Sequence, residues 1–252
     1  MNANPKRWLI DLGNSRLKFA SLDAQGNRSE VIAISHAQTG PVDALLEAIG
    51  PKPVGGEAWL ASVASVERTK LVMEALQESG LEVFRIHSQA RCGGLRIAYR
   101  EPARLGVDRF LSLLAASKRS DGPWLVVSAG TALTVDLLGS DGEHFGGLIA
   151  PMPAHMRAAL AQRFAQLDLP EGQVREFADD SADAIASGVR AAALGLVERA
   201  LRKAHERLGT MPTLLITGGG ADFLADIDHP RTIPLPSLVI DGMASFVQDA
   251  ER

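Results

Sequence analysis

The chain has 252 residues, a formal net charge of −4 at pH 7 and an isoelectric point near 5.9. This slightly acidic balance, without a cluster of basic residues, argues against nucleic-acid binding, and no apolar run is long enough to span a bilayer. The length suffices to bury a substantial core, and a single cysteine, Cys92, excludes an internal disulfide and fits a reducing compartment. The N-terminus shows no signal-peptide pattern, so we expect a cytoplasmic protein.

The first half of the chain alternates strand and helix patterns. Apolar strands are predicted at Trp8–Ile10, Ala58–Val63 and Val83–Ile86. The first of them runs on into Asp11 and is followed, after a glycine-containing turn, by a second strand that ends at Ala20. Helical spacing is found at Thr69–Gly80, where Gly80 is the stop, and at Arg109–Lys118. Strands that alternate with helices favour parallel pairing and an α/β fold.

The second half opens with a pattern similar to the first. Its strand, turn and strand start at Trp124, and we expect Asp11, Gly13 and Asn14 to correspond to Ser128, Gly130 and Thr131. Helices follow from His155 to about Gln166 and from Ser181 to Leu208, and the strand Leu214–Thr217 ends in Gly218-Gly219-Gly220. The repeat predicts two similar halves, 1–117 and 118–252, with a cleft between them.

The two turns carry the residue types that a nucleoside triphosphate requires. Phosphate oxygens need backbone N–H groups at close range, which favours glycine and small hydroxyl residues, and the accompanying Mg²⁺ needs a carboxylate. Asp11-Leu-Gly-Asn-Ser provides that carboxylate and the small residues, while Lys18 adds positive charge. The second turn offers Gly130, Thr131 and Thr134. Neither a P-loop nor a dinucleotide fingerprint is present.

Six segments, in order along nearly the whole chain, resemble the motifs of type III pantothenate kinases. They are Asp11-Leu-Gly-Asn-Ser-Arg-Leu-Lys18, Gly106-Val-Asp-Arg109, Ser128–Asp136, Gly146-Gly-Leu-Ile-Ala-Pro151, Ser181–Gly188 and Ile216-Thr-Gly-Gly-Gly-Ala221. The resemblance implies an actin-like α/β fold of two ribonuclease-H-like halves, each a mixed sheet flanked by helices, with a nucleotide cleft between them. It also implies a homodimer that uses ATP to phosphorylate pantothenate, the first step toward coenzyme A.

The resemblance also implies residue roles. Asp108 would be the general base and Arg109 the clamp on the pantothenate carboxylate. The pocket would further contain Tyr99, Gly106, Val107 and, from the partner subunit, Ser181. Asp11 would lie near Mg²⁺, and the nucleotide would meet Asp11, Leu12, Gly13, Asn14, Ser15, Arg16, Leu17, Lys18 and Thr131.

Two positions depart from the family pattern. Ser128 replaces an Asp that helps bind K⁺ or NH₄⁺ in the family, so we expect either a requirement for unusually high cation or independence of it, and favour independence. Met152 stands where the family usually has a Gly after the proline. We expect this replacement to alter only the packing of the loop.

Other interpretations of the same residues remain open. Asp108 and Arg109 could serve only the helix dipole and the solvent, Tyr99 could be a half-buried strand residue, and Ser181 could cap its helix. Another actin-fold kinase or phosphatase would keep both turns but need not keep Gly106–Arg109. A regulatory protein descended from such a kinase would have no reason to retain Asp108.

Overall fold

The computed structural model describes residues 7–38, 40–50, 56–163 and 171–250. Contacts divide the chain into two compact units, the first made of Met1–Ser120, Ser140–Gly146 and Ser237–Arg252, the second of Asp121–Gly139 and Gly147–Pro236. These limits differ from the expected cut after residue 117, because the last helix returns to the first unit. None of the helices in the described ranges is long and apolar enough to cross a membrane.

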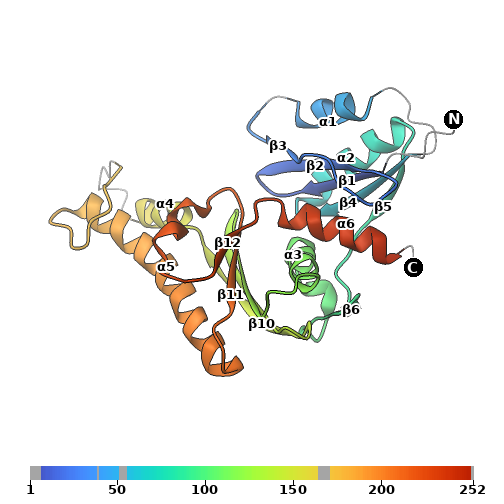
Figure 1. Cartoon of the computed structure of the whole chain (residues 1–252). Coiled ribbons are helices and arrows are strands. Elements are labelled where there is room, and N and C mark those ends of the chain that lie inside the picture. Colours follow the sequence, from blue (N-terminus) through green and yellow to red (C-terminus); the bar gives the residue numbers. More distant parts are fainter. Residues whose placement is uncertain (1–6, 39, 51–55, 164–170, 251–252) are drawn as a thin grey trace. The chain divides into compact units, whose positions relative to one another are not determined.

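The first unit is built on a five-stranded mixed sheet (Figure 1). Its order is β3-β2-β1-β4-β5, with strands at Arg7–Leu12 (β1), Arg16–Leu22 (β2), Ile32–Ser35 (β3), Glu57–Ser62 (β4) and Glu82–Arg85 (β5). β1, β4 and β5 are parallel, as predicted, whereas β2 is antiparallel to both β1 and β3. The three residues between β1 and β2 are too few for the crossover that parallel strands need.

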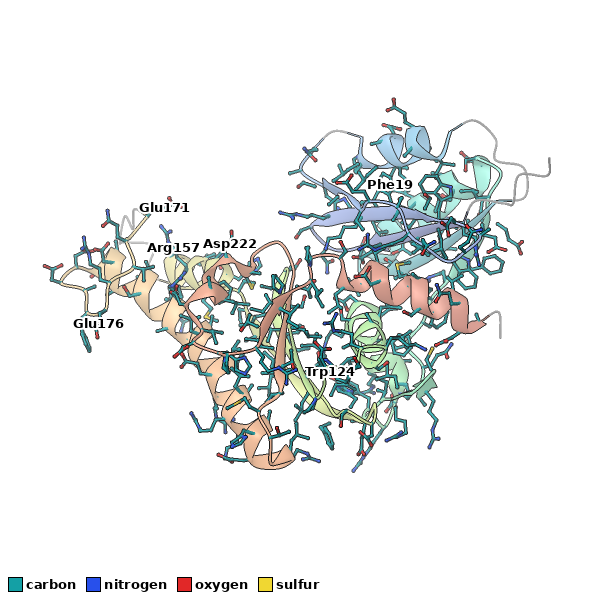
Figure 2. The ribbon with its side chains drawn as sticks, in the orientation of Figure 1. Phe19, Trp124, Arg157, Glu171, Glu176 and Asp222 are labelled. Carbon is teal, nitrogen blue, oxygen red and sulfur yellow. The ribbon has the colours of Figure 1, made fainter. Side chains whose placement is uncertain are left out.

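Helices cover both faces of this sheet (Figure 1). Pro41–Ile49 (α1) and Val66–Glu78 (α2) enclose a core with β1, β2 and β4 that includes Phe19, labelled in Figure 2. Leu238–Ala250 (α6) packs on the same three strands and on Val107–Ser117 (α3). A Cβ at Gly242 of α6 would come within 2.0 Å of the Leu111 carbonyl oxygen, so glycine permits this close crossing. The remaining elements are the short strands Arg91–Cys92 (β6) and Leu95–Arg96 (β7) and the 3-10 turn Pro102–Arg104 (η1).

The second unit repeats this topology. Its sheet has the order β10-β9-β8-β11-β12, with strands at Trp124–Ala129 (β8), Ala132–Leu138 (β9), His144–Pro151 (β10), Thr213–Thr217 (β11) and Thr232–Pro234 (β12). β8 is antiparallel to β9 and parallel to β11, as β1 is to β2 and β4. Asp11 and Ser128 therefore occupy equivalent places, each one residue before the end of its strand.

Two helices and a 3-10 helix complete the second unit. They are Pro153–Arg163 (α4), Ser181–Leu208 (α5) and Ala221–Asp226 (η2). α5 has the predicted limits and packs on β8 and β9, where Ala193, Val197 and Leu201 are buried. α4 begins two residues before the predicted His155, and its expected end at Gln166 lies outside the described residues.

Candidate active site

The turn between β1 and β2 is held in a defined shape. The Gly13 amide donates to the Arg16 carbonyl oxygen at 3.0 Å, and a Cβ on Gly13 would come within 3.2 Å of that oxygen. Leu12 and Leu17 on either side are fully buried in the core, so only their backbone could meet a nucleotide. The turn thus presents Asn14 and Ser15, whose side chains are exposed.

Asp11 is a buried carboxyl group directly before this turn. It is 8% exposed and lies opposite Lys18 in the β1–β2 ladder. Burial raises its pKa to about 7, against the lowering effect of the Lys18 charge and with a further rise from the Asp108 charge. Asp11 of β1 and Asp108 of α3 are therefore close enough to interact. A carboxylate that is this costly to ionise would be stabilised by a bound cation, which suits a Mg²⁺ ligand.

Asp108 lies in the first turn of α3, after the N-cap Gly106. Its Oδ1 accepts a hydrogen bond from the Arg109 amide at 2.8 Å, so the carboxylate does serve the helix N-terminus. An ionised carboxylate can accept several hydrogen bonds, so this contact and a role as a base are compatible. A Cβ at Gly106 would come within 2.6 Å of the same Oδ1, so glycine makes room for the carboxylate at this position.

Arg109 is a buried arginine, only 6% exposed, and its guanidinium contacts Tyr99 in two ways. Nη1 donates to the Tyr99 hydroxyl at 3.0 Å, and Cζ lies 5.7 Å from the centre of the Tyr99 ring. His144, which the motifs did not single out, stacks on Tyr99 with ring centres 6.1 Å apart. Its Nδ1 accepts from the Ala98 amide at 3.4 Å. The structure thus brings the predicted pocket residues Tyr99 and Arg109 into contact and adds His144, which packs on Tyr99.

In the second unit, the glycine run after β11 packs against the β8 turn. A Cβ at Gly218, whose φ is +97°, would come within 2.4 Å of the Ala129 carbonyl oxygen. That oxygen accepts a hydrogen bond from the Gly220 amide at 2.9 Å. The exposed Gly130 and Thr131 follow Ala129 directly, so the glycine run supports the second predicted phosphate turn.

Both departures from the family pattern also lie in the second unit. Ser128 pairs with Thr134 on β9 and with Thr217 on β11, so three hydroxyl side chains share one face of the sheet. Met152 is buried at 9% exposure, and a Cβ on Gly220 would approach its Cε to 2.9 Å. The Met152 side chain therefore fills the space beside the glycine run. Its carbonyl oxygen accepts hydrogen bonds from the His155 and Met156 amides at the start of α4.

The α5 N-terminus corrects one interpretation of the sequence. The cap is Asp180, whose side chain accepts from the Ala182 amide at 2.8 Å and the Asp183 amide at 3.0 Å. Ser181 is therefore the first helical residue, not the cap, and it is exposed. Asp180 competes better for this role because its carboxylate accepts two amides and also interacts favourably with the helix dipole.

Comparison with known proteins identifies the family. The sequence model of the type III pantothenate kinase family matches residues 8–203 of this chain. A type III pantothenate kinase of Stenotrophomonas maltophilia (strain K279a) is 47% identical over 240 residues, which cover 95% of this chain and 96% of that protein. The chain belongs to the type III pantothenate kinase family. A type III pantothenate kinase of Xanthomonas axonopodis pv. citri is 45% identical over 244 residues, 96% of this chain and 98% of the relative.

Solved structures show the same fold at much lower sequence identity. A Baf family protein from Campylobacter jejuni superposes with a TM-score of 0.60 at 22% identity, covering 97% of this chain and 98% of its own. The ethanolamine utilization protein EutJ from Carboxydothermus hydrogenoformans gives 0.52 at 15% identity, covering 96% and 90%. The α/β class with two similar mixed sheets flanked by helices, which the resemblance implied, is confirmed.

Proposed function

We propose that this chain transfers the γ-phosphoryl group of ATP to the primary hydroxyl of pantothenate, the first step toward coenzyme A. The observation that carries the proposal is the start of α3, where Asp108 lies next to the buried Arg109 and acts electrostatically on Asp11. Membership of the kinase family supports ATP as the phosphoryl donor. The compartment that we propose is the cytoplasm, consistent with a single cysteine.

Asp108 is the proposed general base. It accepts the proton of the pantothenate hydroxyl while that oxygen forms a bond to the γ-phosphorus, the bond from phosphorus to the β–γ bridging oxygen breaks, and ADP leaves. Arg109 binds the pantothenate carboxylate through its planar pair of N–H donors. The hydrogen bond to the Tyr99 hydroxyl holds the guanidinium in one orientation, and Gly106 and Val107 complete the wall beside it.

The phosphates are assigned to the two turns. In the first unit the amides of Asn14 and Ser15 and the charge of Lys18 would bind phosphate oxygens, with Gly13 and Arg16 shaping the turn. In the second unit Thr131 has this role. Asp11 would bind Mg²⁺ through water, and the ion would supply positive charge to the phosphates.

A monovalent cation site is proposed to be weak or absent. Ser128 stands where the family has an Asp, and a hydroxyl carries no charge to attract K⁺ or NH₄⁺. The neighbouring Thr134 and Thr217 add further hydroxyl groups but no charge.

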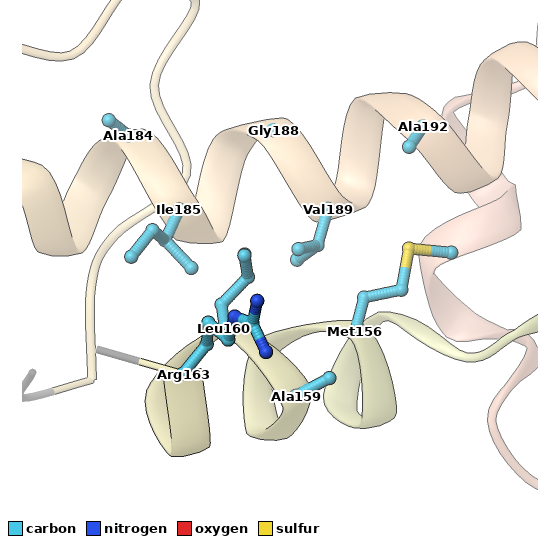
Figure 3. A pocket seen from close by; sticks show the side chains of 9 residues that line it. All are labelled: Met156, Ala159, Leu160, Arg163, Ala184, Ile185, Gly188, Val189 and Ala192. Carbon is cyan, nitrogen blue, oxygen red and sulfur yellow. The ribbon is translucent and has the colours of Figure 1, made fainter. Parts of the chain in front are cut away.

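A homodimer is proposed, with Ser181 reaching the pantothenate pocket of the partner subunit. Between α4 and α5 lies an apolar groove of about 670 Å³, lined by Met156, Leu160, Ile185 and Val189 among others. In Figure 3, Ile185 and Val189 of α5 point toward Met156 and Leu160 of α4 across the groove. Leu148 and Ile149 of β10 and Phe177 before α5 are exposed apolar residues of the same unit. Apolar surface of this kind supports association with a second copy.

A coupled assay with ATP and pantothenate tests the function, with mass spectrometry to identify 4'-phosphopantothenate. We expect ADP formation only when pantothenate is present, because Asp108 is placed for an alcohol acceptor. Full ATP hydrolysis without pantothenate, and no phosphorylated product, would contradict the proposal and favour another actin-fold kinase, a phosphatase or a regulatory protein.

A further inference from the structure

The turn that precedes β2 is bound from outside at three successive carbonyl groups. His36 Nε2 lies 3.0 Å from the Gly13 carbonyl oxygen, and Arg68 Nη1 donates to the Asn14 carbonyl oxygen at 3.2 Å. The His36 amide donates to the Ser15 carbonyl oxygen at 3.0 Å. A carbonyl oxygen can only accept, so Nε2 of His36 carries the proton in this contact.

Both side chains are anchored in the first unit, one in the turn after a strand and the other in a helix. His36 directly follows β3, which pairs with β2. Arg68 is in the first turn of α2, and its own amide donates to the N-cap Ser65 hydroxyl at 3.2 Å. The turn is therefore tied to a strand and to a capped helix that lie far from it along the chain.

These bonds determine where the amides of the turn point. In a planar trans peptide, the C=O of one residue and the N–H of the next point in opposite directions. A bond at the Gly13 oxygen thus orients the Asn14 N–H, and a bond at the Asn14 oxygen orients the Ser15 N–H. These are the two amides assigned above to the phosphates, and a turn already held in this shape loses less conformational entropy when ATP binds.

We propose that His36 and Arg68 are positioning residues that hold the phosphate-binding turn in its ATP-binding conformation without touching the nucleotide. The inference rests on the proposed role of Gly13–Ser15. Loss of one such hydrogen bond should weaken ATP binding about 3- to 10-fold. The pantothenate site on α3 should be unaffected, because neither side chain bonds to it among the contacts described.

The test is to measure KM for ATP, KM for pantothenate and kcat in His36→Ala and Arg68→Met. We expect the KM for ATP to rise about 3- to 10-fold, with kcat and the KM for pantothenate within about twofold of wild type. His36→Gln should restore most of the ATP affinity, because its amide nitrogen can donate to the Gly13 oxygen. The controls are His87→Ala, at an exposed histidine, and Lys70→Met, which removes a charge from the exposed face of α2.

Lys18→Met separates the two possible failures. If it raises the KM for ATP while His36→Ala and Arg68→Met leave it unchanged, the positioning role is wrong and the phosphate assignment stands. If all three variants leave it unchanged, the phosphate assignment itself is wrong. An equal rise in both KM values, with a lowered melting temperature and no rescue by His36→Gln, would show a merely structural role and overturn the inference.

Discussion

Replacing Asp11 with asparagine should stabilise the protein at neutral pH and change its stability little in acid. Asp11 is buried, and its pKa is raised from 3.8 to about 7. Between these values the folded chain holds a proton that the unfolded chain has released. Below about pH 4 Asp11 is protonated in both states and costs the wild type no folding stability. The cost grows as the pH rises and is complete once the pH has passed about 7, where Asp11 is ionised in both states.

The size of the effect follows from the shift. A difference of about 3 pK units, at about 1.36 kcal/mol each, gives a cost of up to about 4 kcal/mol for ionised Asp11 in the folded state. Asparagine has nearly the same shape and no charge, so the variant avoids this cost. For a chain of about this length, 1 kcal/mol shifts the melting temperature by about 2–4 °C, so the gain should be on the order of 10 °C at pH 8.

Thermal unfolding of both proteins in EDTA, at pH values from 5 to 8, measures the effect. Asp222→Asn, at an exposed position labelled in Figure 2, is the control for loss of a surface charge. Adding Asp108→Asn should move the transition to lower pH, because the Asp108 charge raises the pKa of Asp11; Lys18→Met should move it to higher pH. A stability gain in Asp11→Asn that is equal at pH 5 and pH 8 would refute the reasoning.

Four further predictions concern activity and assembly. Asp108→Asn should lower kcat about 100- to 10,000-fold with ATP binding and melting temperature nearly unchanged; more than a third of wild-type activity would exclude Asp108 as the base, and Glu101→Gln is the surface control. Arg109→Lys should raise the KM for pantothenate about 10-fold, since an ammonium group cannot replace the paired donors; an unchanged KM would contradict the clamp. Titration with KCl against choline chloride should leave the wild type nearly unaffected, whereas tight K⁺ activation that is the same in Ser128→Asp would show that this position does not influence the cation. Ile185→Glu should convert a dimer to a monomer in light scattering while Arg202→Glu, on the same helix, does not; a fully active monomeric wild type would exclude the dimer.

Local patterns in the sequence were enough to predict most elements near the site. α5 begins and ends as predicted because its ends carry local signals, a carboxylate cap at Asp180 and a left-handed glycine at Gly209 with φ of +71°. The two hairpins were predictable for the same reason, since short glycine turns join adjacent strands. The motif residues Asp11, Asp108 and Arg109 could likewise be chosen from sequence alone, although their roles remain predictions.

Long-range packing decided the rest. The stacking of His144 on Tyr99, the bonds from His36 and Arg68 to the turn, and the return of α6 to the first sheet join segments that are far apart in the sequence. No local signal marks such contacts, because each depends on which surfaces meet when the chain folds. The raised pKa of Asp11 is of the same kind. The sequence shows an aspartate at a strand end before a glycine turn, but only burial in the folded chain makes its charge costly.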